Sequence, residues 1–142
     1  MIIRKAKVKD LDAIHDFGKK EKYFQVSEGV SGFWKKPQLK KWIKSKSDVF
    51  LVAEEEKIVG FAMATLHKPT GKATFENLWV NPKLRKRGIA INLFKGIMQE
   101  LKKKGAIYVF AMAEINNKSI LRLLKKMKFN KGDKHYWMGK EI

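Results

Sequence analysis

The sequence predicts a mixed α/β domain in which an antiparallel meander is followed by a βαβ crossover. Three apolar runs separated by short turns occupy residues 49–80, which is the pattern of consecutive antiparallel strands. An amphipathic segment at 90–101 then precedes a fourth apolar run at 106–113, as in a strand–helix–strand unit. The 142 residues fit one domain, 1–142, with one core.

The first third of the chain predicts one strand and two helices. Residues 1–6 form a short apolar strand, and Asp10 is a candidate N-cap for the helix that follows. Pro37 suits the first position of a second helix, because proline lacks the N–H that this position leaves unpaired. The apolar positions of this helix recur at i, i+3 and i+4, at Leu39, Trp42 and Ile43.

The remainder of the chain predicts five further strands and two further helices. The meander strands are 49–53, 58–66 and 73–80, and a clearly amphipathic helix then runs from near Gly88 to a stop at Gly105. A buried strand at 106–113 is followed by a helix that Asn117 or Ser119 opens, and by a last strand at 135–138. The predicted order is β-α-α-β-β-β-α-β-α-β.

The composition is strongly basic and free of cysteine. Lysine and arginine number 32 against 14 acids, which gives a formal net charge of +18. Such a surface attracts polyanions, so nucleic acid is one candidate partner, although lysines that are simply solvated produce the same count. The absence of cysteine excludes disulfides, and no apolar stretch reaches the ~20 residues of a membrane span, so we expect a cytoplasmic protein without membrane contact.

The segment NPKLRKRGIA, residues 81–90, has the context of an anion site. It follows a strand ending at Val80 and precedes the amphipathic helix, whose first N–H groups are unpaired and carry a partial positive charge of ~0.5 e. Gly88 allows close approach of an anion to the backbone, and Arg85, Lys86 and Arg87 raise the local potential. The alternative is a glycine that only relieves a tight turn, beside solvated cations.

The same segment resembles a family motif. It lacks the glycine spacing of the Walker and Rossmann patterns, but residues 85–90 resemble the Gln/Arg-x-x-Gly-x-Gly/Ala motif of the GNAT superfamily of acetyl-CoA-dependent N-acetyltransferases. Residues 76–82 are similar to the family's preceding strand and its Val-x-Pro exit. Asn117, twelve residues before Phe129, resembles the family's Asn…Tyr…Gly-Phe segment, so the resemblance covers almost the entire chain.

The resemblance implies a GNAT-like fold with a splayed central sheet and acetyl-CoA as the acyl donor. The pantetheine arm is then expected beside the strand residues Leu78, Trp79 and Val80. Asn117 corresponds to the family asparagine near this arm, and capping of the next helix is a compatible role. Backbone N–H groups are expected to hold the pyrophosphate, from Arg85, Lys86, Arg87, Gly88, Ile89 and Ala90.

Direct attack by an amine requires the neutral amine, whose ordinary pKa is ~10.4, so a base is needed. Glu76 is the candidate base, and an exposed glutamate paired with a lysine is the alternative; Glu114 is the reserve. Leu124 stands where the family has tyrosine and Lys128 where it has glycine, so the usual acid is missing. Either the thiolate leaves unprotonated, or another group such as Tyr108 or Tyr136 donates, or activity is weak.

The acceptor is expected to be a primary amine, on a small molecule or at a protein N-terminus or lysine, with nucleic-acid association possible through the charge. The segment 19–46 is expected to select it, with aromatic residues that line a pocket or are buried, Tyr23, Phe24, Phe33 and Trp34. His15, His67 and His135 lack metal-ligand spacing, so no metal is expected. A CoA-binding sensor or non-catalytic partner and a basic nucleic-acid-binding domain are the rival functions; monomer and homodimer both remain open.

Overall fold

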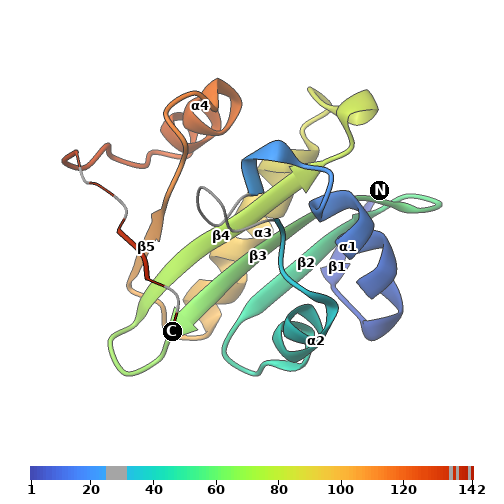
Figure 1. The fold of residues 1–142 in the computed structure, drawn as a ribbon, viewed down its shortest axis with the longest axis horizontal. Helices are drawn as coiled ribbons and strands as arrows, with labels where there is room; N and C mark the ends of the chain where they lie inside the picture. Colours follow the sequence, from blue (N-terminus) through green and yellow to red (C-terminus); the bar gives the residue numbers. More distant parts are fainter. Residues whose placement is uncertain (25–31, 135, 137, 141) are drawn as a thin grey trace.

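The protein is built around a five-stranded mixed sheet with the strand order β1-β2-β3-β4-β5 (Figure 1). The computed structural model describes residues 1–24, 32–134, 136, 138–140 and 142. The first four strands pair antiparallel, and β4 pairs parallel with β5. The strands are β1 (Ile2–Lys5), β2 (Val49–Glu54), β3 (Ile58–His67), β4 (Lys72–Val80) and β5 (Tyr108–Ala111).

Helices cover both faces of the sheet. Helices α1 (Leu11–Gly18) and α2 (Lys36–Lys44) lie on one face, and α3 (Ile89–Lys103) lies on the other (Figure 1). Helix α4 (Lys118–Lys126) packs on the α3 side. Short 3-10 turns complete the described part, at η1 (Val8–Asp10), η2 (Lys22–Phe24) and η3 (Pro82–Leu84).

The sheet separates two apolar clusters, because alternate side chains of a strand point to opposite faces. On β3, Phe61 and Met63 belong to the cluster under α1 and α2, whereas Ala62 and Ala64 belong to the cluster under α3. The small alanines allow α3 to lie close to the sheet. The predicted stripe of α3 is confirmed, since four of its members are 0% exposed, Leu93, Phe94, Ile97 and Leu101.

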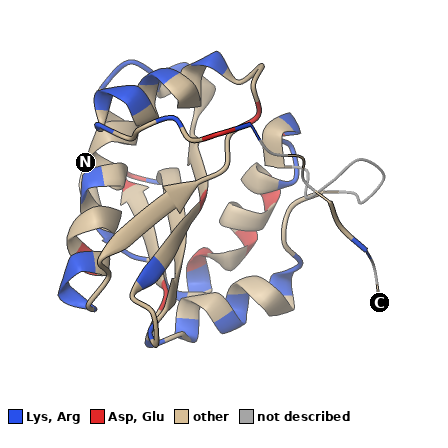
Figure 2. Cartoon of the chain, turned by 90° about the vertical axis from the view of Figure 1, so that its left-hand side faces the viewer, with Lys and Arg blue, Asp and Glu red and all other residues tan. Residues whose placement is uncertain are grey.

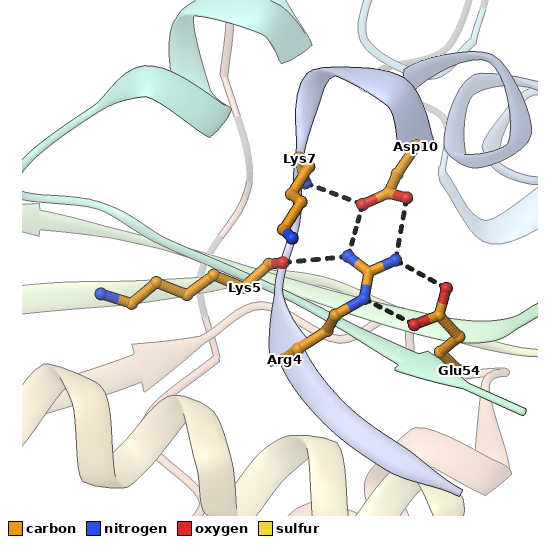
Figure 3. Close-up of polar contacts among 5 residues, drawn as sticks. All are labelled: Arg4, Lys5, Lys7, Asp10 and Glu54. Atoms are coloured by element: carbon orange, nitrogen blue, oxygen red, sulfur yellow. Dashed lines mark hydrogen bonds and ion pairs between the residues drawn. The ribbon is translucent and has the colours of Figure 1, made fainter.

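The guanidinium group of Arg4, on β1, binds two carboxylates, those of Glu54 and Asp10 (Figure 3). Its Nε and Nη2 donate to the carboxylate of Glu54 at 2.7 and 2.8 Å, and its Nη1 and Nη2 donate to Asp10 at 2.7 and 3.0 Å. The Asp10 carboxylate also accepts from the backbone N–H of Lys7. Asp10 is the N-cap of α1, as predicted, but its side chain makes no capping hydrogen bond, because the carboxylate is turned back towards Arg4.

The predicted buried strand at 106–113 is shorter and more exposed than expected. Only Tyr108–Ala111 is a strand, and Tyr108 is 60% exposed, because β5 is the edge strand of the sheet. The predicted last strand at 135–138 lies partly outside the described residues, at His135 and Trp137; Tyr136 and Met138 are described and are not in a strand. Helix α2 begins at Lys36, one residue before Pro37.

Candidate functional site

Strand β4 loses its partner on the β5 side halfway along its length. The parallel pairing with β5 runs from Lys72 to Phe75, whereas β4 itself continues to Val80. On the other side, β4 pairs with β3 along its length, with a bulge that leaves Glu76 without a Cα partner. Figure 1 shows β5 and the chain leading to α4 diverging from the end of β4. Residues 76–80 thus present an open strand edge within the described structure, as the splayed sheet predicted.

The open edge carries the carbonyl group of Val80. The N–H of Asn81 donates to Val59 of β3 at 2.9 Å, so the carbonyl of the preceding residue points to the opposite side of the strand. Arg85 Nε donates to this carbonyl at 3.2 Å. The side chains of the other two predicted strand residues pack inwards, Leu78 towards α3 and Trp79 against Phe17 and Phe61. Only the backbone of Leu78 and Val80 is therefore available to a ligand at this edge.

The loop before α3 has the conformation expected of an anion site. Lys86 and Gly88 adopt positive φ angles of 65° and 80°, and Gly88 is the N-cap of the helix. A Cβ atom built on Gly88 would meet no atom within 4 Å, so the space in front of the helix start is open. Ile89 is 3% exposed and anchors the first turn in the core, and Ala90 packs beside it. The predicted strand–loop–helix arrangement is confirmed.

The two arginines of this loop are already engaged with acids. Arg85 Nη2 lies 3.4 Å from Glu21 Oε2, and Arg87 Nη2 lies 3.3 Å from Glu55 Oε1. Both guanidinium groups are half exposed, so these pairs contribute little to stability but reduce the free positive charge. Lys86 between them is exposed. The backbone N–H groups at the start of α3 are consequently the feature of this loop that is best suited to an anion.

Glu76 lies at the point where the opening begins. Thr65 Oγ1 donates to Glu76 Oε1 at 2.8 Å, and the glutamate is part-buried on the α1–α2 side of the sheet. Burial raises its pKa above the ordinary value, and the negative charge of Asp48 acts in the same direction, while the bond from Thr65 opposes them. The alternative of an exposed glutamate paired with lysine is wrong, since its partner is a threonine hydroxyl. A raised pKa suits a general base.

A cavity of about 510 Å³ adjoins this glutamate on the α1–α2 side. Thr65 belongs both to the wall of the cavity and to the hydrogen bond with Glu76. Sequence reasoning missed this cavity; the available signal was the polar Thr65 in an otherwise apolar strand. Its lining residues are Thr65, Leu66, His67, Thr70, Lys72, Thr74 and Phe110.

Two tryptophans flank the same region. Trp34 Nε1 donates to Asn77 Oδ1 at 2.8 Å, and Trp42 Nε1 donates to the carbonyl of Ala64 at 3.4 Å. The two indole rings pack edge to face, with their centroids 5.2 Å apart. Of the four aromatics predicted in the acceptor segment, Phe33 is buried in the core, while Tyr23, Phe24 and Trp34 are partly exposed.

Three other candidates are exposed. Glu114 is exposed beyond the end of β5. Tyr108 pairs with Lys72, three residues before the last β4–β5 pair, which corresponds to ~10 Å along a strand. Tyr136 is 97% exposed. The structure does not bring Tyr108 to the opening, so it is a poor source of a proton there.

The segment around α4 has mainly structural contacts. Asn117 Oδ1 accepts from the N–H of Ile120 at 3.3 Å, which confirms the helix-capping role. Leu124, at the position of the family tyrosine, is 8% exposed and packed in the α3 cluster. Lys128, at the position of the family glycine, has a left-handed φ of 63°. The backbone at this position therefore has the conformation that glycine favours, although the residue here is a lysine.

The described residues contain neither a cluster of metal ligands nor a membrane-spanning helix. No group of three or more potential metal ligands gathers within residues 1–24, 32–134 and the described positions after them. None of the helices in that same part of the chain has the length and apolar character needed to cross a membrane.

The family model described as "Acetyltransferase (GNAT) family" matches residues 13–129. The chain belongs to the GNAT acetyltransferase family. No curated protein sequence matches it. The matched range includes β4, the loop before α3 and α3 itself.

Solved structures share the GNAT fold at low sequence identity. The ribosomal-protein-S18-alanine N-acetyltransferase of Escherichia coli superposes with a TM-score of 0.73 at 17% identity, over 93% of this chain and 79% of that one. An aminoglycoside N-acetyltransferase solved in complex with CoA superposes with a TM-score of 0.77 at 15% identity, over 99% of this chain and 100% of that one. A protein from Bacillus halodurans described as a transcriptional regulator superposes with a TM-score of 0.77 at 20% identity, over 98% of this chain and 99% of that one.

Proposed function

We propose that the protein transfers an acetyl group from acetyl-CoA directly to a primary amine, with Glu76 as the general base. The observation that carries this proposal is the position of the glutamate. It lies part-buried at the bulge of β4, immediately after Phe75, the last residue of β4 that pairs with β5. A base at the start of the opening can reach an acceptor that approaches from the α1–α2 side.

The residues present fit the donor. The unpaired edge of β4 offers the backbone of Leu78 and Val80, and the carbonyl of Val80 has a second lone pair besides the one that Arg85 uses. Backbone N–H groups from Arg85 to Ala90 would hold the pyrophosphate, and Asn117 would lie beside the pantetheine arm. When bound, acetyl-CoA supplies an activated thioester.

Proton transfer in this site rests on Glu76. A primary amine is mostly protonated at neutral pH, and a carboxylate with a raised pKa is a stronger base than an exposed one. Leu124 cannot donate a proton to the leaving group. We infer that CoA leaves as the thiolate, because an alkyl thiol has a pKa of ~8.5 and the start of α3 carries a partial positive charge. Glu114 is the reserve base.

The test has two stages. Calorimetry should detect acetyl-CoA binding, and thiol release should then be measured with a panel of primary amines. Glu76→Gln should lower kcat by about 100-fold while the affinity for acetyl-CoA stays unchanged, as expected when a general base is removed. Glu56→Gln, in the exposed turn between β2 and β3, is the matched control and should retain activity. An equal loss in both variants, or no loss in Glu76→Gln, would contradict the assignment of the base.

A CoA-binding sensor or non-catalytic partner is the second candidate, and Leu124 in place of the family tyrosine favours it. Binding of acetyl-CoA without thiol release from any amine would support this function instead. A nucleic-acid-binding domain is favoured less, because lysines and arginines are spread over several helices and loops rather than gathered on one element (Figure 2).

A further inference from the structure

The bulge of β4 turns two consecutive side chains to the same face of the sheet. In a regular strand, residues four apart share a face. Phe75, however, belongs to the cluster under α3, whereas Trp79 belongs to the cluster under α1 and α2, so the alternation changes once between them. The register shift makes Glu76 the extra residue, next to Asn77. Both side chains accept hydrogen bonds on the α1–α2 side, that of Asn77 from Trp34.

Trp34 fixes the orientation of the Asn77 amide. An indole N–H can only donate, so the amide oxygen accepts this bond of 2.8 Å, and the Nδ2 group keeps both of its N–H donors for other partners. Trp34 packs edge to face against Trp42 of α2, whose Nε1 donates to the carbonyl of Ala64 at the bulge. The orientation of the amide is therefore set from α2 through two indole rings.

The Nδ2 group of Asn77 is available to a ligand. In the described part of the chain it makes no hydrogen bond, and the one buried side-chain nitrogen or oxygen without a partner there is His15 Nδ1, so solvent reaches Nδ2. Asn77 lies two residues beyond Phe75, where the pairing of β4 with β5 ends. A carboxylate and an N–H donor therefore lie next to each other where the opening begins.

Acetyl transfer to an amine needs a hydrogen-bond donor as well as a base. Attack of the amine nitrogen on the carbonyl carbon moves the π electron pair of the C=O bond onto the oxygen, while the base takes the proton from the nitrogen. The C=O bond then re-forms as the C–S bond breaks, and the electron pair of that bond leaves on sulfur. Negative charge on the oxygen is largest between these two events, so a donor fixed beside the oxygen accelerates the reaction.

We propose that Asn77 Nδ2 donates a hydrogen bond to the carbonyl oxygen of the acetyl group, and that Trp34 is the positioning residue that orients this donor. The proposal rests on the proposed function and adds a second catalytic residue beside Glu76. A carbonyl oxygen only accepts hydrogen bonds and therefore matches an amide nitrogen, whereas a protonated amine, which only donates, does not.

Asn77→Asp tests the donor with little change of shape. Aspartate keeps an oxygen for Trp34 but places a second oxygen where Nδ2 was, so the developing charge meets repulsion instead of a donor. The kcat should fall by about 100-fold, while the affinity for acetyl-CoA in calorimetry stays nearly unchanged. Each kcat is taken at the plateau of the variant's pH profile, because a second carboxylate raises the pKa of Glu76. Asn130→Asp, at an exposed position after α4, makes the same change of net charge and should retain activity.

Two tryptophan variants test the positioning role. Trp34→Phe keeps a ring beside Trp42 but removes the N–H that orients the amide, so kcat should fall by about 10-fold with little change in KM for the amine, as for a donor that is present but misaligned. Trp42→Phe is the matched control, because it removes an indole N–H that binds a backbone carbonyl, and it should leave kcat nearly unchanged. An equal loss in the two variants would overturn the positioning role of Trp34.

The infrared band of the acetyl carbonyl gives a readout that a purely structural role would not move. Acetyl-CoA that carries an isotope label at the carbonyl is bound without any amine. The carbonyl band should lie at lower wavenumber in the wild type than in Asn77→Asp, because a hydrogen bond to the oxygen weakens the C=O bond. Glu76→Gln should keep the wild-type band, since that variant retains the donor.

Failure of this inference is distinguishable from failure of the proposed function. An identical carbonyl band in the wild type and Asn77→Asp, or an unchanged kcat in Asn77→Asp, would overturn the role of Asn77 while leaving the acetyltransferase intact. An equal loss of kcat in Asn130→Asp would likewise overturn it, because the change of net charge would then account for the effect. Absence of acetyl-CoA binding in calorimetry would overturn both.

Discussion

Thr65 Oγ1 donates a hydrogen bond of 2.8 Å to Glu76 Oε1, across the β3–β4 pair and beside its bulge. The bulge leaves Glu76 without a Cα partner on β3, and the hydroxyl holds its carboxylate on the α1–α2 side of the sheet. The same threonine lines the cavity. One side chain thus connects the orientation of the proposed base to the wall of the cavity.

Thr65→Val should move the pH dependence of acetyl transfer upwards. The hydrogen bond from Thr65 stabilises the charged carboxylate and lowers the pKa of Glu76, whereas burial raises it. Loss of the hydroxyl leaves burial unopposed, so the acid limb of the kcat/KM profile should shift to higher pH. Thr74→Val, which removes another hydroxyl of the cavity, is the control and should leave this limb in place. A downward shift would contradict the proposed role of Glu76.

Gly88→Asp should abolish acetyl-CoA binding, whereas Gly88→Asn should reduce it less. Both side chains occupy the open space before α3, and both meet the cost of a φ of 80°, which asparagine and aspartate tolerate better than most residues. They differ in the negative charge, which repels a phosphate at the helix start. Calorimetry with acetyl-CoA measures the difference. Equal affinities in the two variants would show that no anion binds at this position.

Arg4→Met should lower the free energy of unfolding by about 2–3 kcal/mol at pH 7, because it leaves the Asp10 carboxylate, 5% exposed, without its cation. Arg122→Met, on the exposed side of α4, is the matched control and should cost much less. Urea unfolding followed by circular dichroism measures both. Similar losses in the two variants would mean that the Arg4 cluster contributes little.

The Arg4 cluster should also make stability sensitive to acid. Burial works against the charge of Asp10, but the bonds from Arg4 and from the Lys7 N–H lower its pKa; the bond from Arg4 lowers the pKa of Glu54. Groups with lowered pKa values stabilise the fold above their ordinary values of 3.8 and 4.5, and this contribution is lost as the pH falls through the lowered values. The difference in the free energy of unfolding between the wild type and Arg4→Met should therefore shrink as the pH falls from about 5 to about 3, the range in which these carboxylates begin to take up protons.

Lys128→Gly should stabilise the protein by about 0.5–1 kcal/mol. Lys128 follows α4 with a left-handed φ of 63°, which costs a residue with a Cβ atom more than it costs glycine. Lys126→Gly, two residues earlier at the end of the helix, should instead destabilise by about 0.5–1 kcal/mol. The measurement is thermal unfolding of the two variants in parallel. Destabilisation by both would show that the left-handed conformation carries no strain.

The fold could be predicted where an element is long and has clear boundaries. Helix α3 has apolar positions at regular spacing, strands β2 to β4 are apolar runs separated by short turns, and the predicted bounds of all four agree with the structure within one or two residues. Strand β5 could not be predicted as exposed, because an unbroken apolar run is equally typical of a strand that is covered on both faces. Asp10 is the N-cap that the sequence predicts. Its pairing with Arg4 could not be predicted, because it belongs to a cluster with Glu54, which lies far from Arg4 in the sequence.

The part of the candidate site that is a local sequence motif could be predicted, but the part that depends on pairing between strands could not. The loop before α3 is a local strand–loop–helix pattern, so residues 85–90 could be identified directly. The cavity depends on the register between β3 and β4, which brings Thr65 opposite Thr74, and on Phe110 of β5, which lies beside Thr74. Neither pairing leaves a signal in the local sequence.

Within the part of the chain that the structure describes, no strand pairs with the outer side of β5, and this edge makes solubility depend on ionic strength. Ile107, Tyr108 and Met112 are each more than half exposed along this edge, and such an edge can pair with that of another molecule. The net charge of +18 keeps molecules apart at low salt, but at ~0.15 M salt the repulsion reaches only about 8 Å. Concentrated preparations should consequently be more monodisperse in dilute buffer than in strong salt, the reverse of the usual practice for a basic protein.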